Sequence, residues 1–158
     1  MSKICCFTGH RDVPEELTLA IYTELEAVLA ELIEKEDVRD FRAGGAIGFD
    51  TIAALVVLKL KLKYPDIRLH LFLPCYDQDK RFNSFQKSLY GFAKDEADSV
   101  IYVQKNYSST AMHKRNRALV DGSDFCVAFL RKSEGGTQYT VNYARRKGVP
   151  VIKLLDNK

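Results

Sequence analysis

Two short glycine segments of this chain have the residue types that can hold an anion. Gly44-Gly45 and Gly135-Gly136 each follow an apolar run and each come before a helical pattern. Glycine lets backbone N–H groups approach a bound group closely, and the start of a helix adds partial positive charge. The two pairs therefore predict a phosphate-binding site. Taken alone, each pair is more often only a turn between a strand and a helix.

Further polar residues follow apolar runs in the same way. Arg11 and Arg115 can each present a planar guanidinium to a phosphate, although a single arginine on a helix is most often solvated or ion-paired. Asp50 can accept hydrogen bonds from a ribose, or it can cap its own helix. The predicted ligand-binding set also includes Thr8, Gly9, His10, Asn116, Thr137 and Thr140. Thr137 and Thr140 have a structural alternative as caps at the start of a helix.

Three side chains are candidates for acid–base catalysis: His10, Asp50 and Glu134. His10 has a structural alternative, since a histidine of this kind is often only a hydrogen-bonded part of the fold. The G-x-G-x-x-G fingerprint of dinucleotide sites is missing after the first apolar run, and the G-x-x-x-x-G-K-[ST] loop of ATPases and GTPases is missing throughout. The catalytic residues therefore stay open at this point.

Cysteine and histidine are spaced too irregularly to predict a metal site. Cys5, Cys6, Cys75 and Cys126 form no C-x-x-C pair, and the three histidines are far apart. We expect the cysteines to be small buried hydrophobic residues in a reduced compartment. No metal ligand set is predicted, and the only cofactor expected is a bound nucleotide or nucleotide-derived molecule.

Length and composition indicate one ordinary globular domain that covers residues 1–158. The chain is 46% hydrophobic and 28% charged, with a formal net charge of +3. Its apolar runs are short and interrupted by charges, which predicts no membrane span and a cytoplasmic location. The small net charge makes a dedicated duplex-DNA binder an unlikely class.

Strand and helix patterns alternate from end to end. Apolar runs predict strands at residues 4–7, 38–42, 67–73, 100–103, 125–130 and 151–155. Helical patterns begin at Asp12, where Pro14 and Glu15 complete a helix-start signal, and recur at 50–64, 80–94, 112–120 and 137–147. This alternation predicts an α/β fold, a single Rossmann-like three-layer domain with a mainly parallel sheet of five to six strands.

In open parallel sheets, ligands bind beyond the carboxyl ends of the strands, where the strand order reverses. Each group of special residues follows a predicted strand, so all of them are expected on one rim of the sheet. We give less weight to a set of aromatic residues in the third helical segment, which we expect to be core or subunit contacts: Phe82, Phe85, Tyr90 and Phe92.

An ordered set of motifs covers nearly the whole chain. It comprises Cys6-Phe7-Thr8-Gly9-His10-Arg11, Gly45-Ala46-Ile47-Gly48-Phe49-Asp50, Leu73-Pro74-Cys75, Met112-His113-Lys114-Arg115-Asn116, Val120-Asp121-Gly122-Ser123-Asp124 and Gly135-Gly136-Thr137-Gln138-Tyr139-Thr140. Together they resemble the YpsA-like branch of the bacterial SLOG superfamily, which also includes the Lonely Guy phosphoribohydrolases and DprA. The resemblance implies a pocket for a small phosphate-bearing, nucleotide-derived ligand, often in a homodimer.

The resemblance also bears on catalysis. Lonely Guy enzymes have an arginine in a motif similar to the one around Arg115, and a glutamate where this chain has Thr140. Threonine cannot carry the negative charge that stabilises a cationic sugar. Ligand binding or sensing is therefore the preferred function, with a phosphoribohydrolase as the alternative and single-stranded nucleic-acid binding similar to DprA as the second alternative. We expect Arg115→Ala to abolish ligand binding and to leave folding nearly intact.

Overall fold

The apolar runs pair into one six-stranded sheet in the computed structural model, which describes residues 2–132 and 134–156. The strand order is β4-β3-β2-β1-β5-β6, and every neighbouring pair is parallel. The strands are β1 (Lys3–Gly9), β2 (Val38–Ala43), β3 (Arg68–Leu73), β4 (Ser99–Tyr102), β5 (Phe125–Phe129) and β6 (Val151–Lys153). The predicted Rossmann-like α/β arrangement is confirmed, with a sheet that is parallel throughout.

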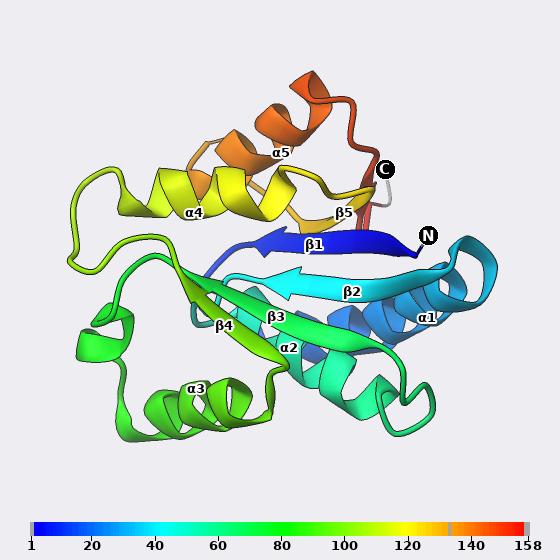
Figure 1. Ribbon diagram of the computed structural model, residues 1–158, viewed down its shortest axis with the longest axis horizontal. Coiled ribbons are helices and arrows are strands. Elements are labelled where there is room, and N and C mark those ends of the chain that lie inside the picture. Colours follow the sequence, from blue (N-terminus) through cyan, green and yellow to red (C-terminus); the bar gives the residue numbers. More distant parts are fainter. Residues whose placement is uncertain (1, 133, 157–158) are drawn as a thin grey trace.

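Helices cover both faces of the sheet and make three layers. Figure 1 shows α4 and α5 on one side of the sheet, and α1, α2 and α3 on the other. Their bounds are α1 (Thr18–Glu36), α2 (Phe49–Leu60), α3 (Ser84–Glu96), α4 (Ala111–Val120) and α5 (Gly136–Arg146), with short 3-10 helices η1 (Glu15–Leu17) and η2 (Gln78–Arg81). The arrangement leaves the carboxyl ends of the strands facing the loops that enter α1, α2, α4 and α5.

Each face of the sheet has its own apolar core. The larger core packs α1 and α2 against the central strands, and on α2 it contains Ala53, Val56, Val57 and Leu60, which recur at spacings of three and four residues. A smaller core lies between the sheet and the α4–α5 layer. It contains Cys6, Leu119, Val120, Cys126, Ala144 and Val149. The central strands are therefore buried on both sides, as the continuous apolar runs predict.

The first helix begins later than the sequence predicts. Residues from Glu15 to Leu17 form η1, and α1 begins only at Thr18 with no side-chain cap. Asp12 does not cap the helix, because its carboxylate instead accepts a hydrogen bond from Lys132 Nζ at 3.0 Å. The expected helix start at Asp12 was wrong, because the Asp12 carboxylate bonds Lys132, a residue distant in the sequence, and not the first turn of the helix.

The third helical segment is split into two parts. The η2 turn ends at Arg81, and α3 begins at Ser84 behind a capping box in which Asn83 and Gln86 bond each other's backbone N–H groups. Phe82 and Tyr90 are buried, as expected for core residues, whereas Phe85 and Phe92 are exposed to 71% and 49%.

Candidate functional site

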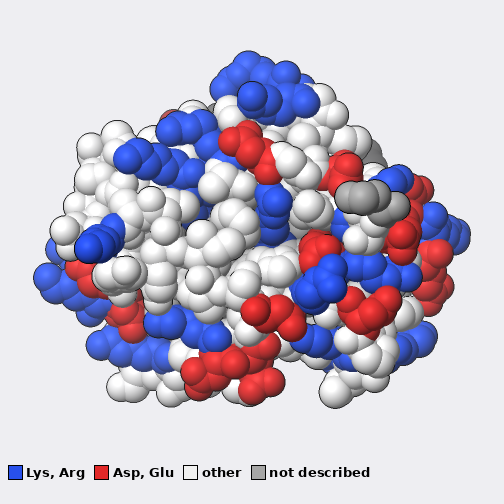
Figure 2. Space-filling view, in the orientation of Figure 1, with Lys and Arg blue, Asp and Glu red and all other residues white. Residues whose placement is uncertain are grey.

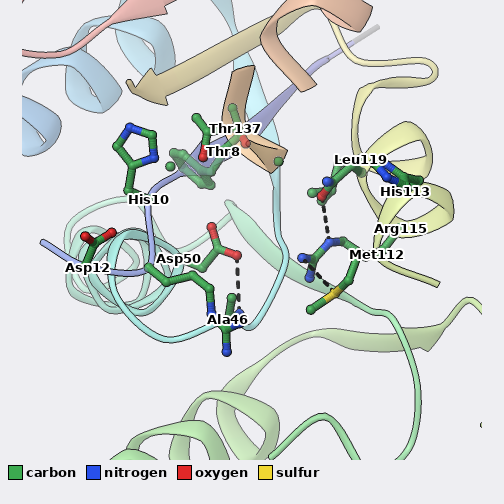
Figure 3. Close-up of a pocket in the computed structure, with 15 residues that line it drawn as sticks. Thr8, His10, Asp12, Ala46, Asp50, Met112, His113, Arg115, Leu119 and Thr137 are labelled. Atoms are coloured by element: carbon green, nitrogen blue, oxygen red, sulfur yellow. Dashed lines mark hydrogen bonds between the residues drawn. The ribbon is translucent and has the colours of Figure 1, made fainter. Parts of the chain in front are cut away.

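The candidate site lies where the strand order reverses. From β1 the chain adds β2, β3 and β4 on one side, and then crosses over to place β5 on the other side of β1. A pocket of about 400 Å³ opens at the carboxyl ends of β1 and β5, the position at which such sheets bind ligands (Figure 3). Its lining residues are Phe7, Thr8, Gly9, His10, Arg11, Asp12, Ala46, Asp50, Met112, His113, Arg115, Asn116, Leu119, Gly136 and Thr137.

The loop that follows β1 forms one wall of the pocket. At Gly9, a Cβ atom would lie 2.4 Å from the ring of Phe49, so only glycine lets α2 approach β1 this closely. At Gly48, φ is +84° and a Cβ atom would lie 2.2 Å from the carbonyl oxygen of Arg11. The β1–α1 and β2–α2 loops are therefore in backbone contact, and a larger residue at either glycine would separate them.

His10 connects this wall to two other loops. Its carbonyl oxygen accepts a hydrogen bond from Phe49 N at 3.1 Å. Its ring Nε2 accepts hydrogen bonds from Arg131 N at 2.8 Å and Lys132 N at 3.1 Å. Burial lowers the pKa of His10, and the nearby Lys132 charge adds to this effect. Because Nε2 is occupied as an acceptor, the imidazole presents only Nδ1 to the pocket.

Arg115 reaches from α4 across the carboxyl edge of the sheet. It is only 5% exposed, and its Nε donates to Asn116 Oδ1 at 2.9 Å while its Nη1 donates to the carbonyl oxygen of Gly44. A Cβ atom on Gly44 would lie 2.6 Å from Arg115 Nη1 and 2.8 Å from Asp50 Oδ2. Arg115 is thus a buried structural contact as well as a pocket residue, and the solvated alternative is wrong.

Asp50 supplies the negative charge beside Arg115. It lies in the first turn of α2, is 6% exposed, and accepts a hydrogen bond from Ala46 N at 3.2 Å. Burial raises the pKa of Asp50, and the attraction of the Arg115 charge opposes that rise. Its carboxylate bonds the loop before the helix, so it organises the β2–α2 turn and also lines the pocket.

The start of α5 forms the opposite wall. Gly135 has φ +99°, and α5 begins at Gly136. Gly136 and Thr137 line the pocket, so the first turn of the helix, whose N–H groups have no partner within the helix, borders it. The Thr137 side chain is buried and lines the pocket beside Thr8 (Figure 3). Thr140 is fully buried, and its hydroxyl donates to Gly136 O at 2.8 Å within the helix.

The structure brings together most of the predicted ligand-binding residues. Nine of them line the pocket: Thr8, Gly9, His10, Arg11, Asp50, Arg115, Asn116, Gly136 and Thr137. The remaining four, Gly44, Gly45, Gly135 and Thr140, lie beside the pocket and are absent from its lining. Glu134 is exposed and is also absent from the lining.

Sequence reasoning did not select six of the lining residues: Phe7, Asp12, Ala46, Met112, His113 and Leu119. Met112 and His113 belong to the same motif as Arg115, and both stand in the first turn of a helix that begins at the rim. This position in the first turn, at the rim of the sheet, could have identified both residues as pocket lining. Leu119 lies two turns further along α4, and nothing in its spacing points to the pocket.

Within residues 2–132 and 134–156, no group of three or more His, Cys, Asp or Glu side chains is placed to hold a metal ion. The four cysteines are buried free thiols, which confirms their predicted burial. In the same described part of the chain, no helix is long and apolar enough to cross a membrane.

A second polar cluster joins β2, β3 and β4 away from the pocket. The ring of His70 is 2.6 Å from Ser99 Oγ and 2.8 Å from Asp40 Oδ1. Asp40 also accepts two hydrogen bonds from Arg68, at 2.7 and 3.1 Å, which hold the pKa of its carboxyl group down. None of these residues lines the pocket. The cluster links three neighbouring strands side by side.

The chain is similar to known proteins over most of its length. The model of the YspA SLOG family matches residues 6–150. The uncharacterised SPbeta prophage-derived protein YoqJ of Bacillus subtilis strain 168 is 34% identical over 140 residues, which are 81% of this chain and 82% of YoqJ. A UPF0398 protein of Bacillus cereus strain B4264 is 30% identical over 107 residues, 66% of this chain, and the match spans 58% of that relative's length.

Among solved structures, the chain is similar to DNA processing protein A of Helicobacter pylori, whose single-stranded DNA binding mode that structure describes. The TM-score is 0.67 with 16% sequence identity, and the match covers 96% of this chain and 64% of the other. At this identity the likeness shows the fold alone.

Proposed function

The chain belongs to the YspA SLOG family, and we propose that it binds or senses a nucleotide or nucleotide-derived phosphate ligand in the pocket at the carboxyl end of β1, bordered by the starts of α2, α4 and α5. The proposal rests on one observation: the N-terminus of α5, which begins at a glycine, and a buried arginine of α4 both line the same pocket. Gly136 and Thr137 bring the N-terminus of α5, and Arg115 brings its guanidinium from α4. Both features favour a negatively charged group.

The charge balance of the pocket supports a phosphate attached to a polar body. Arg11 and Arg115 are the cations of the lining, and Asp12 and Asp50 are its carboxylates. Arg115 has five N–H groups, and three of them contact Asn116, Gly44 and Met112, which leaves two for a ligand. Asp50 is suited to accept hydrogen bonds from a hydroxyl group such as that of a ribose. A pocket of about 400 Å³ has room for one nucleotide.

A matched pair of threonine variants tests the phosphate-binding role. Thr137→Val removes a hydroxyl from the pocket wall, whereas Thr140→Val removes one that bonds only its own helix. We expect Thr137→Val to weaken the binding of adenosine monophosphate about tenfold, the value of one hydrogen bond to a charged group, as measured by calorimetry. Thr140→Val is expected to bind like the unmodified protein. Equal affinities for both variants and the parent would contradict the proposed placement of the phosphate.

The phosphoribohydrolase alternative rests on Asp50. Of the three catalytic candidates, Glu134 is exposed outside the lining, and His10 has one ring nitrogen occupied by the backbone. Asp50 alone places a carboxyl group with a raised pKa inside the pocket. Release of free base from nucleoside monophosphates, followed by chromatography, would establish this activity, and Asp50→Asn should then abolish it. Binding without release of base supports the sensing function.

Single-stranded nucleic acid is a second candidate ligand, favoured by the distribution of charge. Residues 111–148 contain eight of the 24 basic residues and only three of the 21 acidic ones, a net +5. Figure 2 shows Lys and Arg gathered over the region of α4 and α5, where the exposed cations include Lys114, Arg145, Arg146 and Lys147. Such a surface suits a phosphodiester backbone.

Charge reversal tests this second candidate. The triple variant Arg145→Glu, Arg146→Glu, Lys147→Glu should reduce the binding of a fluorescent oligo-dT at least tenfold at low salt. The control carries the same change of charge at exposed lysines on the opposite layer and its edges: Lys35→Glu, Lys63→Glu, Lys87→Glu. Equal loss in both triple variants would indicate unspecific attraction to the net charge. Absence of binding at low salt would remove the candidate.

A further inference from the structure

His10 bonds two other loops of the pocket wall through different atoms. Its backbone carbonyl accepts from Phe49 N, at the start of α2, and its ring accepts from the amides of Arg131 and Lys132, in the loop that leads into α5. The ring is 9% exposed and stands edge-on to Phe129, with the ring centroids 5.8 Å apart. The imidazole is therefore held in one orientation.

We propose that His10 is a positioning residue that holds the loop before α5 in its ligand-binding position only while the imidazole is neutral, so that acid releases this loop and weakens ligand binding. The inference rests on the proposed ligand-binding function of the pocket. Its basis is the hydrogen-bond pattern: two N–H donors converge on Nε2, which must offer a lone pair to both. The proton of the neutral ring is consequently on Nδ1.

Protonation changes this contact from attraction to repulsion. An imidazolium carries a proton on both nitrogens, so Nε2–H would point at the N–H groups of Arg131 and Lys132. Both hydrogen bonds would be lost. The second link between the same loops is the ion pair of Lys132 with Asp12, at 3.0 Å, whose side chains are 58% and 73% exposed. Exposed pairs of this kind contribute little, so among the described residues the link between these two loops depends mainly on His10.

The charged groups around the ring set the pH range of this release. On the loop before α5, Lys132 and Arg131 disfavour the imidazolium, and on the loop of His10 itself Asp12 favours it. From β5 the ring meets Phe129, which is uncharged. Burial and the two cations keep the pKa of His10 below its ordinary value of about 6.5. The loop is thus attached at neutral pH, and the attachment is lost as the pH falls below about 6.5 through the folded-state pKa.

Release of this loop would weaken ligand binding through its effect on the start of α5. Gly136 and Thr137 line the pocket, and they come only a few residues after the two amides that His10 holds. When those amides are free, the first turn of α5 no longer has a fixed distance from Thr8 and Gly9 on the opposite wall. A bound anion then loses contacts from one of its two sides.

Two measurements on the ligand-free protein test the geometry directly. Nitrogen-15 NMR of the imidazole should show the Nδ1–H tautomer at pH 7.5, the less common form for an exposed histidine. Hydrogen exchange should show protection of the Arg131 and Lys132 amides that is lost in His10→Leu. An Nε2–H tautomer, or unchanged protection in His10→Leu, would overturn the proposal whether or not the protein binds a nucleotide.

A conservative variant tests the acid response. In His10→Gln the amide oxygen can take the place of Nε2 as an acceptor, and it does not titrate. Binding of adenosine monophosphate at pH 7.5 and pH 5.5 is compared as the ratio of variant to parent affinity, which cancels ionisation of the phosphate itself. We expect the ratio of variant to parent affinity to rise at least fivefold between pH 7.5 and pH 5.5, whatever its value at pH 7.5.

A ratio that does not change with pH would overturn the acid response. If neither protein binds the nucleotide at pH 7.5, the proposed function fails for this probe. The tautomer and the amide protection then decide the role of His10 independently, because both are measured without ligand.

Discussion

Arg115 carries a buried positive charge, and its neighbours determine what its removal would do. Its guanidinium bonds the Gly44 carbonyl and the Asn116 side chain, and it offsets the charge of buried Asp50. Burial lowers the pKa of Arg115, and the nearby Asp50 carboxylate opposes that shift. These contacts argue against the expectation that Arg115→Ala leaves folding nearly intact, because a carboxylate and a carbonyl would lose a buried partner.

We predict that Arg115→Ala lowers the free energy of unfolding by about 3 kcal/mol, a cost typical of removing one member of a buried charge pair. Adding Asp50→Asn should recover part of this loss, since no uncompensated carboxylate then remains. Urea denaturation of the two single variants and the double variant measures the coupling.

Arg117→Ala is the matched control on the same helix. Arg117 donates to the Tyr139 hydroxyl at 2.9 Å, and its removal should lower the free energy of unfolding much less than removal of Arg115, because Arg117 has no buried charge partner among the described residues. Additive losses for Arg115→Ala and Asp50→Asn would show that the two charges do not interact.

At the scale of elements, the start of α5 depends on the backbone of one glycine. Gly135 has φ +99° and ψ −172°, a conformation that other residues adopt at a cost of about 1–3 kcal/mol. At Gly136 the backbone is helical, and a Cβ atom would meet only Asn116 Nδ2, at 3.8 Å. The two neighbours in one motif therefore have different physical roles.

We predict that Gly135→Ala lowers the free energy of unfolding by about 1–3 kcal/mol, while Gly136→Ala leaves it unchanged or slightly raised. Thermal and urea denaturation compare the two variants, which carry the same added methyl group at adjacent positions. A loss at Gly136 equal to that at Gly135 would show that space, and not backbone conformation, limits this turn.

The sequence predicts most elements because their apolar spacing is regular. On α2 the inward positions alternate at three and four residues, and all four are buried. The start of α1 and the split before α3 were not predicted, for different reasons. The Asp12 carboxylate accepts a hydrogen bond from Lys132, about 120 residues away, and no local pattern reports such a partner. The capping box of Asn83 and Gln86 at the start of α3 is a local signal that sequence reasoning missed.

At the scale of the whole molecule, a general rule for parallel sheets predicts where the site lies, whereas its side-chain contacts depend on how distant segments pack. The rule that ligands bind at the carboxyl rim of a parallel sheet selected the loops after β1, β2 and β5. Two contacts of the site depend on how the chain crosses from β4 through α4 to β5, which lies beside β1. They are the bond from Arg115 to Gly44 and the bonds from Arg131 and Lys132 to His10. These contacts join residues 71 to 122 positions apart, beyond the reach of spacing arguments.

The two apolar cores are predicted to unfold together as one domain. They lie on opposite faces of one sheet, and Arg115 bonds the α4 layer to the β2–α2 loop across the edge of the sheet. We expect one transition, with coincident midpoints for far-ultraviolet circular dichroism and for fluorescence of the eight tyrosines, because the chain has no tryptophan. Separate midpoints would indicate that the α4–α5 layer unfolds on its own.

The concentration of cations in residues 111–148 has an effect before any ligand makes contact. That segment has a net charge of +5, while the rest of the chain has sixteen basic and eighteen acidic residues. The molecule is therefore an electric dipole with its positive pole over α4 and α5, which contribute His113, Gly136 and Thr137 to the pocket. An anion diffusing nearby is steered toward this pole, so its association rate falls as ionic strength rises even where the final contacts are unchanged.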